Sequence, residues 1–430
     1  MKRVITIIII LIILVAGIYG YVYYRLNRNQ TDLQVIPTTA NNFPSSVIPN
    51  SASSSTDFPV SPSTQPGQTN QINTANTTVN TTDKLAKITA GPIAGASLVT
   101  IVNKKIASST VWYAEKETGN LFSFNPASGE LTPVSNTTIP YVSEAYFGKF
   151  GNDPRIILRY TKDSKVENFL AKLVNQSYAT GTSPSSIKQL GGLILNPSLN
   201  QIAISPNKDR YFSLIATTLG SASFINDFSG VKQDQLAYVS AHPRWNISWP
   251  AENIVVFQSA PLANSPGMIF FYNPTTKSFQ KKLSGLNGLT ALVSPDGQKI
   301  LYGYNDNNQN LILKLKYLNK ALDTQIGVVT LPEKCVWSTN SASIFCAVPN
   351  KLSPDSYPDN WYMGLTSFTD GFWQINATTG ETKMVFNPEN MGSSQKIDGT
   401  NLFLTAKEDK LFFTNKKDGS LWMLNLTDNI

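Results

Sequence analysis

A turn signal that recurs at nearly constant spacing is the feature that most constrains this sequence of 430 residues. Four copies each separate two short apolar runs: Ser205-Pro-Asn-Lys208, Trp249-Pro-Ala-Glu252, Ser294-Pro-Asp-Gly297 and Ser338-Thr-Asn-Ser341. Their first residues are 44, 45 and 44 positions apart. A second signal, in which an Asn turn joins two strands, recurs near residues 125, 273 and 376. A period of about 40–50 residues with several short strands is typical of a propeller blade.

The repeat predicts an all-β fold, a seven-bladed β-propeller with four strands in each blade. The blades are expected at residues 95–135, 140–190, 198–240, 244–284, 288–330, 332–386 and 397–430. The last unit lacks a fourth strand, and we expect Lys87–Ile93 to supply it, which closes the ring without exposed strand edges. A pair of β-sandwiches also contains many short strands, but it does not account for the even spacing.

Residues 1–28 are expected to form a membrane anchor. In the run of 21 residues from Val4 to Tyr24, Thr6 is the only clearly polar side chain. At about 1.5 Å per residue such a helix spans roughly 30 Å, the thickness of the hydrocarbon layer of a bilayer. A cleaved signal peptide is the alternative, but its apolar region is normally about 7–15 residues and ends in a clear small-residue site. We therefore expect an uncleaved single-pass signal-anchor.

Residues 29–83 are expected to be a disordered linker. Of these 55 residues, 38 are Ser, Thr, Asn, Gln or Pro, and there are three acids and no base. Such a segment cannot bury enough apolar surface to offset the entropy lost on ordering. Random-coil scaling gives it a mean reach of about 40 Å. A long polar stretch suits translocation, so we expect the domain at residues 84–430 to lie outside the cytoplasm.

The composition argues against several functional classes. The net charge of +7 is spread over the chain without basic runs longer than two, which is too dilute for a nucleic-acid partner. A single His argues against His-based catalysis and His-rich metal sites. The common nucleophile, phosphate-loop, zinc-protease and EF-hand motifs do not occur. Asn305–Asn310 is rich in oxygen ligands but holds one acid, so a polar turn is expected rather than a calcium site. We expect no catalytic motif, metal or cofactor.

The unit Ser-Pro-Asp-Gly-Gln-Lys-Ile-Leu-Tyr at residues 294–302 resembles the WD40-like repeat of TolB-type propellers, although the Trp-Asp and Gly-His signatures of true WD40 repeats are missing. Residues 84–430 also resemble membrane-anchored propellers of small-genome uncultured bacteria. Ile88–Ala96, Cys335–Ser338 with Phe345–Pro349, and Asp359–Tyr362 carry this second resemblance. It implies an anchored propeller and no particular activity.

Cys335 and Cys346 flank the turn at Ser338–Ser341, each five positions out from the pair Asn340–Ser341 within it. Two strands of one hairpin would bring them opposite each other, with Cα atoms about 4.5 Å apart at a non-hydrogen-bonded position. That separation lies within the reach of a disulfide, and an oxidising exterior favours the bond. The alternative is two buried thiols that act as small apolar side chains.

Two clusters contain candidate binding residues, one in the connection into the fourth unit and one in the insertion at residues 350–370 of the sixth. The candidates are His242, Arg244, Trp245, Tyr357, Trp361 and Tyr362. In a propeller such a loop shares a face with the connections between blades, so we expect both clusters on one face. Trp, Tyr and Arg dominate binding hot spots. The alternatives are that Pro243 and Trp245 shape a turn beside a solvated His242, and that the loop aromatics pack the loop itself.

These features favour a membrane-anchored binding or scaffold module outside the cytoplasm, with a protein, peptide or glycan partner. The alternative is a cell-envelope enzyme, a glycan hydrolase or lyase that uses carboxylates in the channel of the propeller. Partly buried carboxylates with raised pKa that face the channel would favour the enzyme. An aromatic and basic face without such carboxylates would favour the binding module.

Overall fold

The computed structural model describes residues 77–103, 106–175, 187–231, 235–321, 323–353, 355–391 and 396–427. The expected anchor at Val4–Tyr24 and the linker up to residue 76 lie outside these ranges. Within the ranges described, no helix is both long and apolar enough to cross a bilayer. These ranges are almost entirely strand and turn. Three short helical elements interrupt them: η1 (Pro332–Lys334), α2 (Asp359–Tyr362) and η2 (Pro388–Met391).

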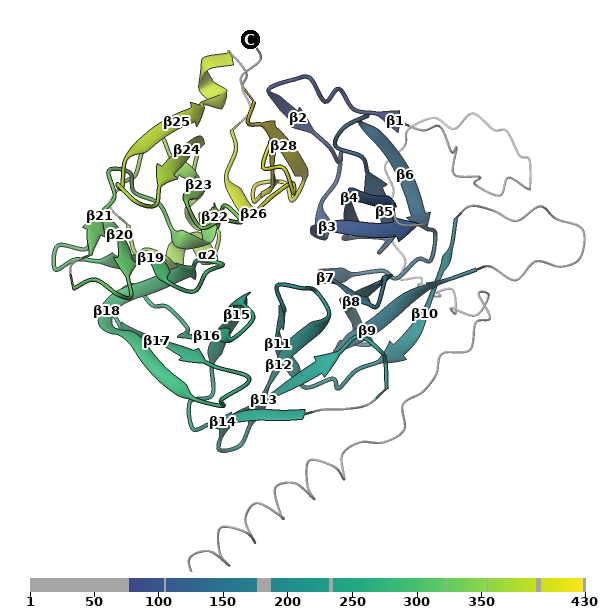
Figure 1. Ribbon diagram of the computed structural model, residues 1–430, viewed down its shortest axis with the longest axis horizontal. Helices are drawn as coiled ribbons and strands as arrows, with labels where there is room; N and C mark the ends of the chain where they lie inside the picture. The colour runs from purple at the N-terminus through teal and green to yellow at the C-terminus, as the bar shows by residue number, and fades with distance from the viewer. Residues whose placement is uncertain are drawn as a thin grey trace, which may run out of the picture.

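The strands of the described chain form six antiparallel sheets arranged in a ring (Figure 1). The first three sheets contain β1 (Thr77–Thr78), β3 (Ile93–Asn103), β4 (Ile106–Glu115), β5 (Leu121–Phe124) and β6 (Glu130–Ser135); β7 (Val142–Phe150), β8 (Asp153–Lys162), β9 (Lys165–Val174) and β10 (Gln189–Ile194); and β11 (Leu199–Ile204), β12 (Arg210–Thr217), β13 (Gly220–Asp227) and β14 (Gln235–Ser240). From β3, β7 and β11 the chain runs outward from the centre of the ring, strand by strand, and β1 adds to the outer edge of the first sheet beside β6 (Figure 1).

The other three sheets complete the ring. They contain β15 (Trp245–Ala251), β16 (Ile254–Ser259), β17 (Pro266–Tyr272), β18 (Phe279–Val293), β19 (Lys299–Asn305), β20 (Leu311–Tyr317) and β21 (Thr324–Gln325); β22 (Cys335–Trp337), β23 (Ser343–Pro349), β24 (Asp370–Asn376) and β25 (Thr382–Phe386); and β26 (Gly399–Leu404), β27 (Lys410–Asn415), β28 (Leu421–Asn425) and β2 (Leu85–Lys87).

One strand is shared by two four-strand units. β18 has 15 residues; its first half pairs with β17 and its second half pairs with β19. The sequence predicted a break between units at residues 284–288, and the strand instead runs through this boundary. Gly285 and Gly288 have positive φ there, so the chain changes direction without leaving the sheet.

A segment ahead of the first unit completes the last sheet. β2 pairs antiparallel with β28, with Leu85 opposite Leu424. The sequence predicted this closure for Lys87–Ile93, and the paired strand lies earlier, at Leu85–Lys87. Gly91 and Pro92 explain the shift, since Pro has no N–H to donate to a ladder and Gly weakens a strand. The sheets also begin before the expected domain boundary at residue 84, because β1 pairs with β6.

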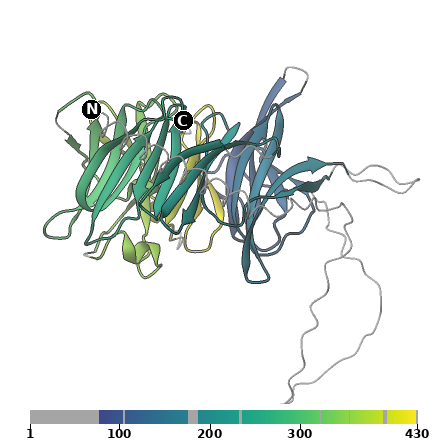
Figure 2. The same ribbon diagram turned by 90° about the horizontal axis from the view of Figure 1, so that it is seen from below.

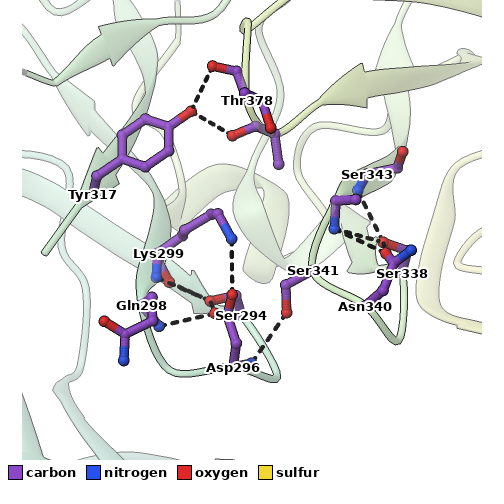
Figure 3. Close-up of polar contacts among 12 residues, drawn as sticks. Ser294, Asp296, Gln298, Lys299, Tyr317, Ser338, Asn340, Ser341, Ser343 and Thr378 are labelled. Carbon is purple, nitrogen blue, oxygen red and sulfur yellow. Dashed lines mark hydrogen bonds and ion pairs between the residues drawn. The ribbon is translucent and has the colours of Figure 1, made fainter. Parts of the chain in front are cut away.

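Four of the turns share one hydrogen-bonding pattern, beginning at Ser205, Ser294, Ser338 and Thr405. In the turn at Ser294, its N–H donates to the carbonyl of Lys299 at 3.0 Å, and its hydroxyl accepts the N–H of Lys299 at 3.0 Å (Figure 3). The residue three positions on has positive φ in all four turns. The sequence identified the first three. The signal at Trp249 differs, because a two-residue turn joins β15 to β16 there.

The apolar cores lie between neighbouring sheets. Phe212 of one sheet packs edge-on against Trp249 and Phe257 of the next, with ring centroids 6.1 and 5.7 Å apart. The core at the closure joins Ala86 of β2 to residues of the first and last sheets. Burial of each large apolar side chain contributes roughly 1.5–3 kcal/mol, so the ring is stabilised where one sheet covers another.

The up-and-down course of the strands gives the ring two faces. Face A carries the connections between units and the loops between second and third strands, residues 116–120, 163–164, 218–219, 260–265, 306–310, 350–369 and 416–420. Face B carries the turns between first and second strands, residues 151–152, 205–209, 252–253, 294–298, 338–342 and 405–409. In the edge-on view, α2 projects from face A and the hairpin of β3 and β4 projects from the opposite edge (Figure 2).

Candidate functional site

The loop at residues 350–369 on face A packs on an apolar core of its own. Tyr357, Trp361 and Phe368 are buried; the ring centroid of Phe368 lies 5.6 Å from that of Tyr357 and 6.2 Å from that of Trp361. Leu311 and Leu331 of the neighbouring unit complete this core. Two of the three aromatic residues proposed for recognition in this loop, Tyr357 and Trp361, therefore pack the loop itself.

A buried ionic cluster lies beneath the loop. Lys334, at the end of η1, places its Nζ 2.8 Å from Oδ2 of Asp370 and 2.5 Å from Oδ1 of Asp398. It also donates to the carbonyl oxygen of Gly399 at 3.0 Å. The side chains of all three ionisable residues are inaccessible to solvent. The three protons of the ammonium group therefore each have an acceptor, and the cluster joins η1 to the starts of β24 and β26.

Asp398 connects this cluster to the loop. Its carboxylate accepts the indole N–H of Trp361 at 3.1–3.2 Å and the backbone N–H of Phe368 at 3.0 Å. The ammonium group of Lys334 lies 5.3 Å from the ring centroid of Trp361, within cation–π range. The loop is thus held by charge-assisted hydrogen bonds to the body of the protein as well as by apolar packing.

Asp370 has fewer hydrogen-bond donors around its carboxylate than Asp398 has. Its Oδ2 also accepts the backbone N–H of Gly399 at 2.7 Å, while Oδ1 has no hydrogen-bond partner in the described part of the chain. Burial raises the pKa of Asp370 to about 6, although the neighbouring Lys334 opposes the rise. The cost of burying the charged carboxylate therefore exceeds the gain from its ion pair.

Glu333 is the second carboxylate with a raised pKa. It is half-buried beside Lys334, and its Oε1 accepts the hydroxyl of Tyr362. Burial raises the pKa of Glu333, and the hydrogen bond from Tyr362 opposes the rise. Its Oε2 is buried and has no hydrogen-bond partner among the described residues. Glu333 is therefore a candidate for acid–base chemistry on geometric and electrostatic grounds.

The end of the loop projects into solvent on a fixed base. Tyr362, Met363 and Leu365 are 41%, 64% and 72% exposed. At the base, Asp359 accepts the backbone N–H of Ala263 at 3.1 Å. The loops at 260–265 and 350–369 are also bridged by Asn305, whose amide donates to the carbonyls of Ala263 and Tyr357. The projecting residues are therefore presented by a loop that is fixed on several sides.

The connection at residues 241–244 leads into β15. Trp245 is buried against Phe257 and Phe270, and its indole N–H donates to the hydroxyl of Ser240 at 3.0 Å. The ring of His242 lies 4.4 Å from that of Trp245, while Arg244 is exposed. Trp245 therefore shapes this connection, and Arg244 is the member of the cluster that is open to solvent.

Comparison with solved structures agrees with this architecture. An oligogalacturonate lyase from Vibrio parahaemolyticus aligns with 82% of this chain and 98% of its own, with a TM-score of 0.50 and 9% identity. TolB from Acinetobacter baumannii aligns over 68% of this chain and 63% of its own, with a TM-score of 0.38 and 12% identity. The propeller domain of the trilobed protease from Pyrococcus furiosus aligns over 66% of this chain and 83% of its own, with a TM-score of 0.41 and 10% identity. The fold is that of a β-propeller.

At these identities the similarity concerns the fold alone. The propeller fold that the repeat predicts is thus matched in structure by the lyase, which aligns with a TM-score of 0.50. Neither a family model nor a curated protein matches the sequence.

The topology of the propeller places both sequence-predicted clusters on face A. No hydrogen bond, ion pair or ring contact joins them among the residues that the structure describes. The sequence pattern did not single out Lys334, Glu333, Asp370 or Asp398. Sequence spacing offers no signal for them, because η1, β24 and β26 meet only when two neighbouring sheets pack together.

The cysteines occupy opposed positions. Cys335 of β22 pairs in register with Cys346 of β23, and their Cα atoms are 4.1 Å apart. The structure joins them by a disulfide, and both side chains are buried against Trp337 and Ile344. The register that the sequence predicted for this hairpin is the one observed.

Proposed function

We propose that this chain is a membrane-anchored propeller outside the cytoplasm that acts as a binding or scaffold module for a protein, peptide or glycan partner. The proposal includes seven blades. In this count the seven-stranded sheet represents two blades that share β18, and β2 completes the seventh.

The binding role is supported by the loop at residues 350–369, which the buried cluster of Lys334, Asp370 and Asp398 holds in place. Lys334 and Asp398 have their hydrogen-bonding groups occupied within the protein, and both are inaccessible to solvent. Their contacts hold a loop whose end exposes Tyr362, Met363 and Leu365. A rigid, exposed and partly aromatic element is typical of a docking surface, because little conformational entropy is lost when it binds. Arg244 and Tyr362 are the exposed members of the set proposed from the sequence.

The test uses a photo-crosslinking amino acid at one position on each face. Met363 serves on face A, and Gln298 in the exposed turn at 294–298 serves on face B. In cells that make the full chain, we expect a reproducible crosslink to a protein, peptide or glycan from at least one position. A chain that gives only background crosslinks at both positions would argue against a binding module.

The second candidate function is an envelope enzyme that acts on a glycan, and Glu333 favours it. A carboxylate with raised pKa, one unpartnered oxygen and a tyrosine hydroxyl in contact suits a general acid. A glycosidase needs a second carboxylate, and Asp370, the other one with a raised pKa, is inaccessible. Asp323, which pairs with Lys316 at 3.0 Å, provides a control carboxylate away from Glu333. Turnover of a wall glycan that is lost in Glu333→Gln and retained in Asp323→Asn would establish this function in place of binding.

A further inference from the structure

The contacts of Lys208 connect three units of the ring. Lys208 lies in the turn at residues 205–209, which follows β11 on face B. Its Nζ donates to the hydroxyl of Ser97 at 2.6 Å and to the carbonyl oxygen of Leu98, both in β3 of the first unit. Its own carbonyl oxygen accepts the backbone N–H of Lys149, near the end of β7 in the second unit, at 2.7 Å. Because β3, β7 and β11 are the innermost strands of their sheets, these contacts lie on the inner side of the ring (Figure 1).

The ammonium group of Lys208 has no counterion among the residues that the structure describes. Both groups that accept its hydrogen bonds are neutral. An ammonium group has three N–H donors, so one donor of Lys208 has no acceptor in the described ranges. The side chain of Lys149 is exposed, and within the same ranges it makes neither a hydrogen bond nor an ion pair.

The acids that follow these two lysines in the chain are paired with arginines. Asp153 lies 3.8 Å from the guanidinium group of Arg155, and Asp209 lies 3.8 Å from Nε of Arg210. Neither carboxylate forms an ion pair with Lys208. The neighbouring acids therefore leave the charge of the lysine pair in place.

The electrostatic environment of Lys208 agrees with this contact pattern. Burial lowers the pKa of Lys208 to about 8, and the positive charge of Lys149 lowers it further in the same direction. No described carboxylate opposes these two effects. Two ammonium groups of like charge are thus held near each other, and an anion between them would relieve their repulsion.

A phosphate group matches this arrangement in charge and in hydrogen-bonding capacity. A phosphate monoester carries about −1.5 to −2 charges at pH 7 and three acceptor oxygens. One oxygen can accept the remaining N–H of Lys208, and the flexible side chain of Lys149 can reach another, since lysine binds phosphate as a point charge. A carboxylate carries one charge and would neutralise only one of the two ammonium groups.

We propose that Lys208 and Lys149 form a binding site for a phosphate group on the inner side of face B. The inference deepens the proposed function, because it rests on the binding role and names a chemical group by which a partner is recognised. It assigns this recognition to face B, away from the loop end at Tyr362–Leu365 on face A.

The experiment measures the binding of inorganic phosphate to the full chain in neutral detergent micelles, by isothermal titration calorimetry at pH 7 and constant ionic strength. Lys208→Gly and Lys149→Gln each remove one ammonium group, and glycine keeps the positive φ of 60° at position 208. Lys277→Gly is the matched control, because Lys277 also has a positive φ, 56°, and is exposed in a turn of the fourth unit. Affinity should fall about tenfold or more in both site variants, since each loses a charge-assisted hydrogen bond, and should be unchanged in the control.

The pH dependence of binding provides a second measurement. Phosphate affinity should decline as the pH rises through about 8, because Lys208 then loses its proton. An ordinary exposed lysine keeps its proton until about pH 10. An affinity that stays constant between about pH 7 and pH 9 would contradict the role of Lys208.

Equal phosphate affinity of the wild type and both site variants would overturn the proposal, as would the absence of saturable binding at millimolar phosphate. Acetate that binds as tightly as phosphate would overturn the choice of phosphate. Competition by O-phosphoserine or by glucose 6-phosphate supports the site and distinguishes a phosphorylated peptide from a phosphorylated glycan as the source of the group. A chain that binds phosphate but gives only background crosslinks keeps the site and loses the proposed partner, so the two proposals fail separately.

Discussion

Lys334 shows how a single residue can organise a loop and a junction between sheets. Lysine is almost never fully buried unless it is paired, because removing its charge from water is costly. Here two carboxylates and one carbonyl oxygen accept hydrogen bonds from its ammonium group, and the indole ring of Trp361 lies over it. A buried pair of this kind is weak evidence for net stabilisation, but removing one partner leaves a charge uncompensated.

Lys334→Met should lower the free energy of unfolding by about 3–5 kcal/mol, because Asp370 and Asp398 would remain buried without a cation. Urea unfolding measures the change. The matched control is Lys299→Met, which breaks the partly exposed pair with Asp296 and should cost about 1 kcal/mol or less. Replacing both aspartates by Asn in the Lys334→Met chain should restore part of the loss. Equal stability of Lys334→Met and the wild type would contradict the structural role of the cluster.

Asp370 should make a recognisable contribution to the pH dependence of stability. Its pKa is about 6 in the folded protein and close to 3.8 in the unfolded chain. Between these values the folded state holds a proton that the unfolded state has released. The stabilisation that protonated Asp370 adds to the free energy of unfolding is therefore fully present below about pH 4 and is lost as the pH rises through 6. The difference between the urea midpoints of wild type and Asp370→Asn should change across this window, and a constant difference would refute the shift.

At the scale of elements, the three-residue strand β2 closes the ring by pairing with the last strand of the chain. It covers the outer edge of β28, and Ala86 joins the core between the first and last sheets. The hydroxyl of Thr89 continues the contact by accepting the backbone N–H of Leu421 at 2.9 Å. An uncovered strand edge is a template for pairing with another chain.

A chain that begins at residue 89 should therefore associate into dimers or larger species, because it lacks β1 and β2 and exposes β28. Light scattering during size-exclusion chromatography measures the molar mass. A chain that begins at residue 76 is the control, since it keeps both strands and should behave as the parent domain does. If the chain beginning at residue 89 is monomeric and equally stable, β2 is not needed to close the ring.

The disulfide in the hairpin of β22 and β23 allows a chemical test of whether the domain lies in an oxidising compartment. In protein made in an oxidising compartment, Cys335 and Cys346 should resist alkylation after denaturation until a reductant is added. Mass spectrometry of the intact protein measures this. Replacing both by Ser should cost about 2 kcal/mol, because the closed loop is short. Full alkylation without reduction would refute the disulfide and weaken the assignment to the exterior.

At the scale of the whole molecule, the ring separates two chemically different faces. Face A carries most of the exposed apolar loop ends, and face B carries the turns with buried Ser and Thr hydroxyls. Neighbouring turns on face B contact each other; the backbone N–H of Asp296, for example, donates to the hydroxyl of Ser341 at 3.0 Å (Figure 3).

The topology of the whole chain can be measured with a fusion reporter. A phosphatase that is active only outside the cytoplasm, fused after Asp83 or after the last residue, should be active at both positions. A reporter that requires the cytoplasm should be inactive at both. The reverse pattern would contradict the expected location. A mature N-terminus near Gly17 would contradict the uncleaved anchor and leave the location intact.

The sequence by itself determined the periodic features. The spacing of Ser205, Ser294 and Ser338 predicts repeated four-strand units, since each turn needs a positive φ and a hydroxyl acceptor at fixed offsets. The opposed cysteines follow from the same hairpin register. These are local properties, and the residues that produce them lie within a few positions of one another.

Only the tertiary structure decided which side chains meet across units. Asp370 and Asp398 lie 36 and 64 positions after Lys334 in the chain, and the three meet because two neighbouring sheets pack face to face. The burial of Tyr357 and Trp361 also depends on a neighbouring unit, which supplies Leu311 and Leu331. The position of β2 was decided by the edge of β28, more than 330 residues away. Contacts at such separations depend on the packing of the whole ring, and no local pattern encodes them.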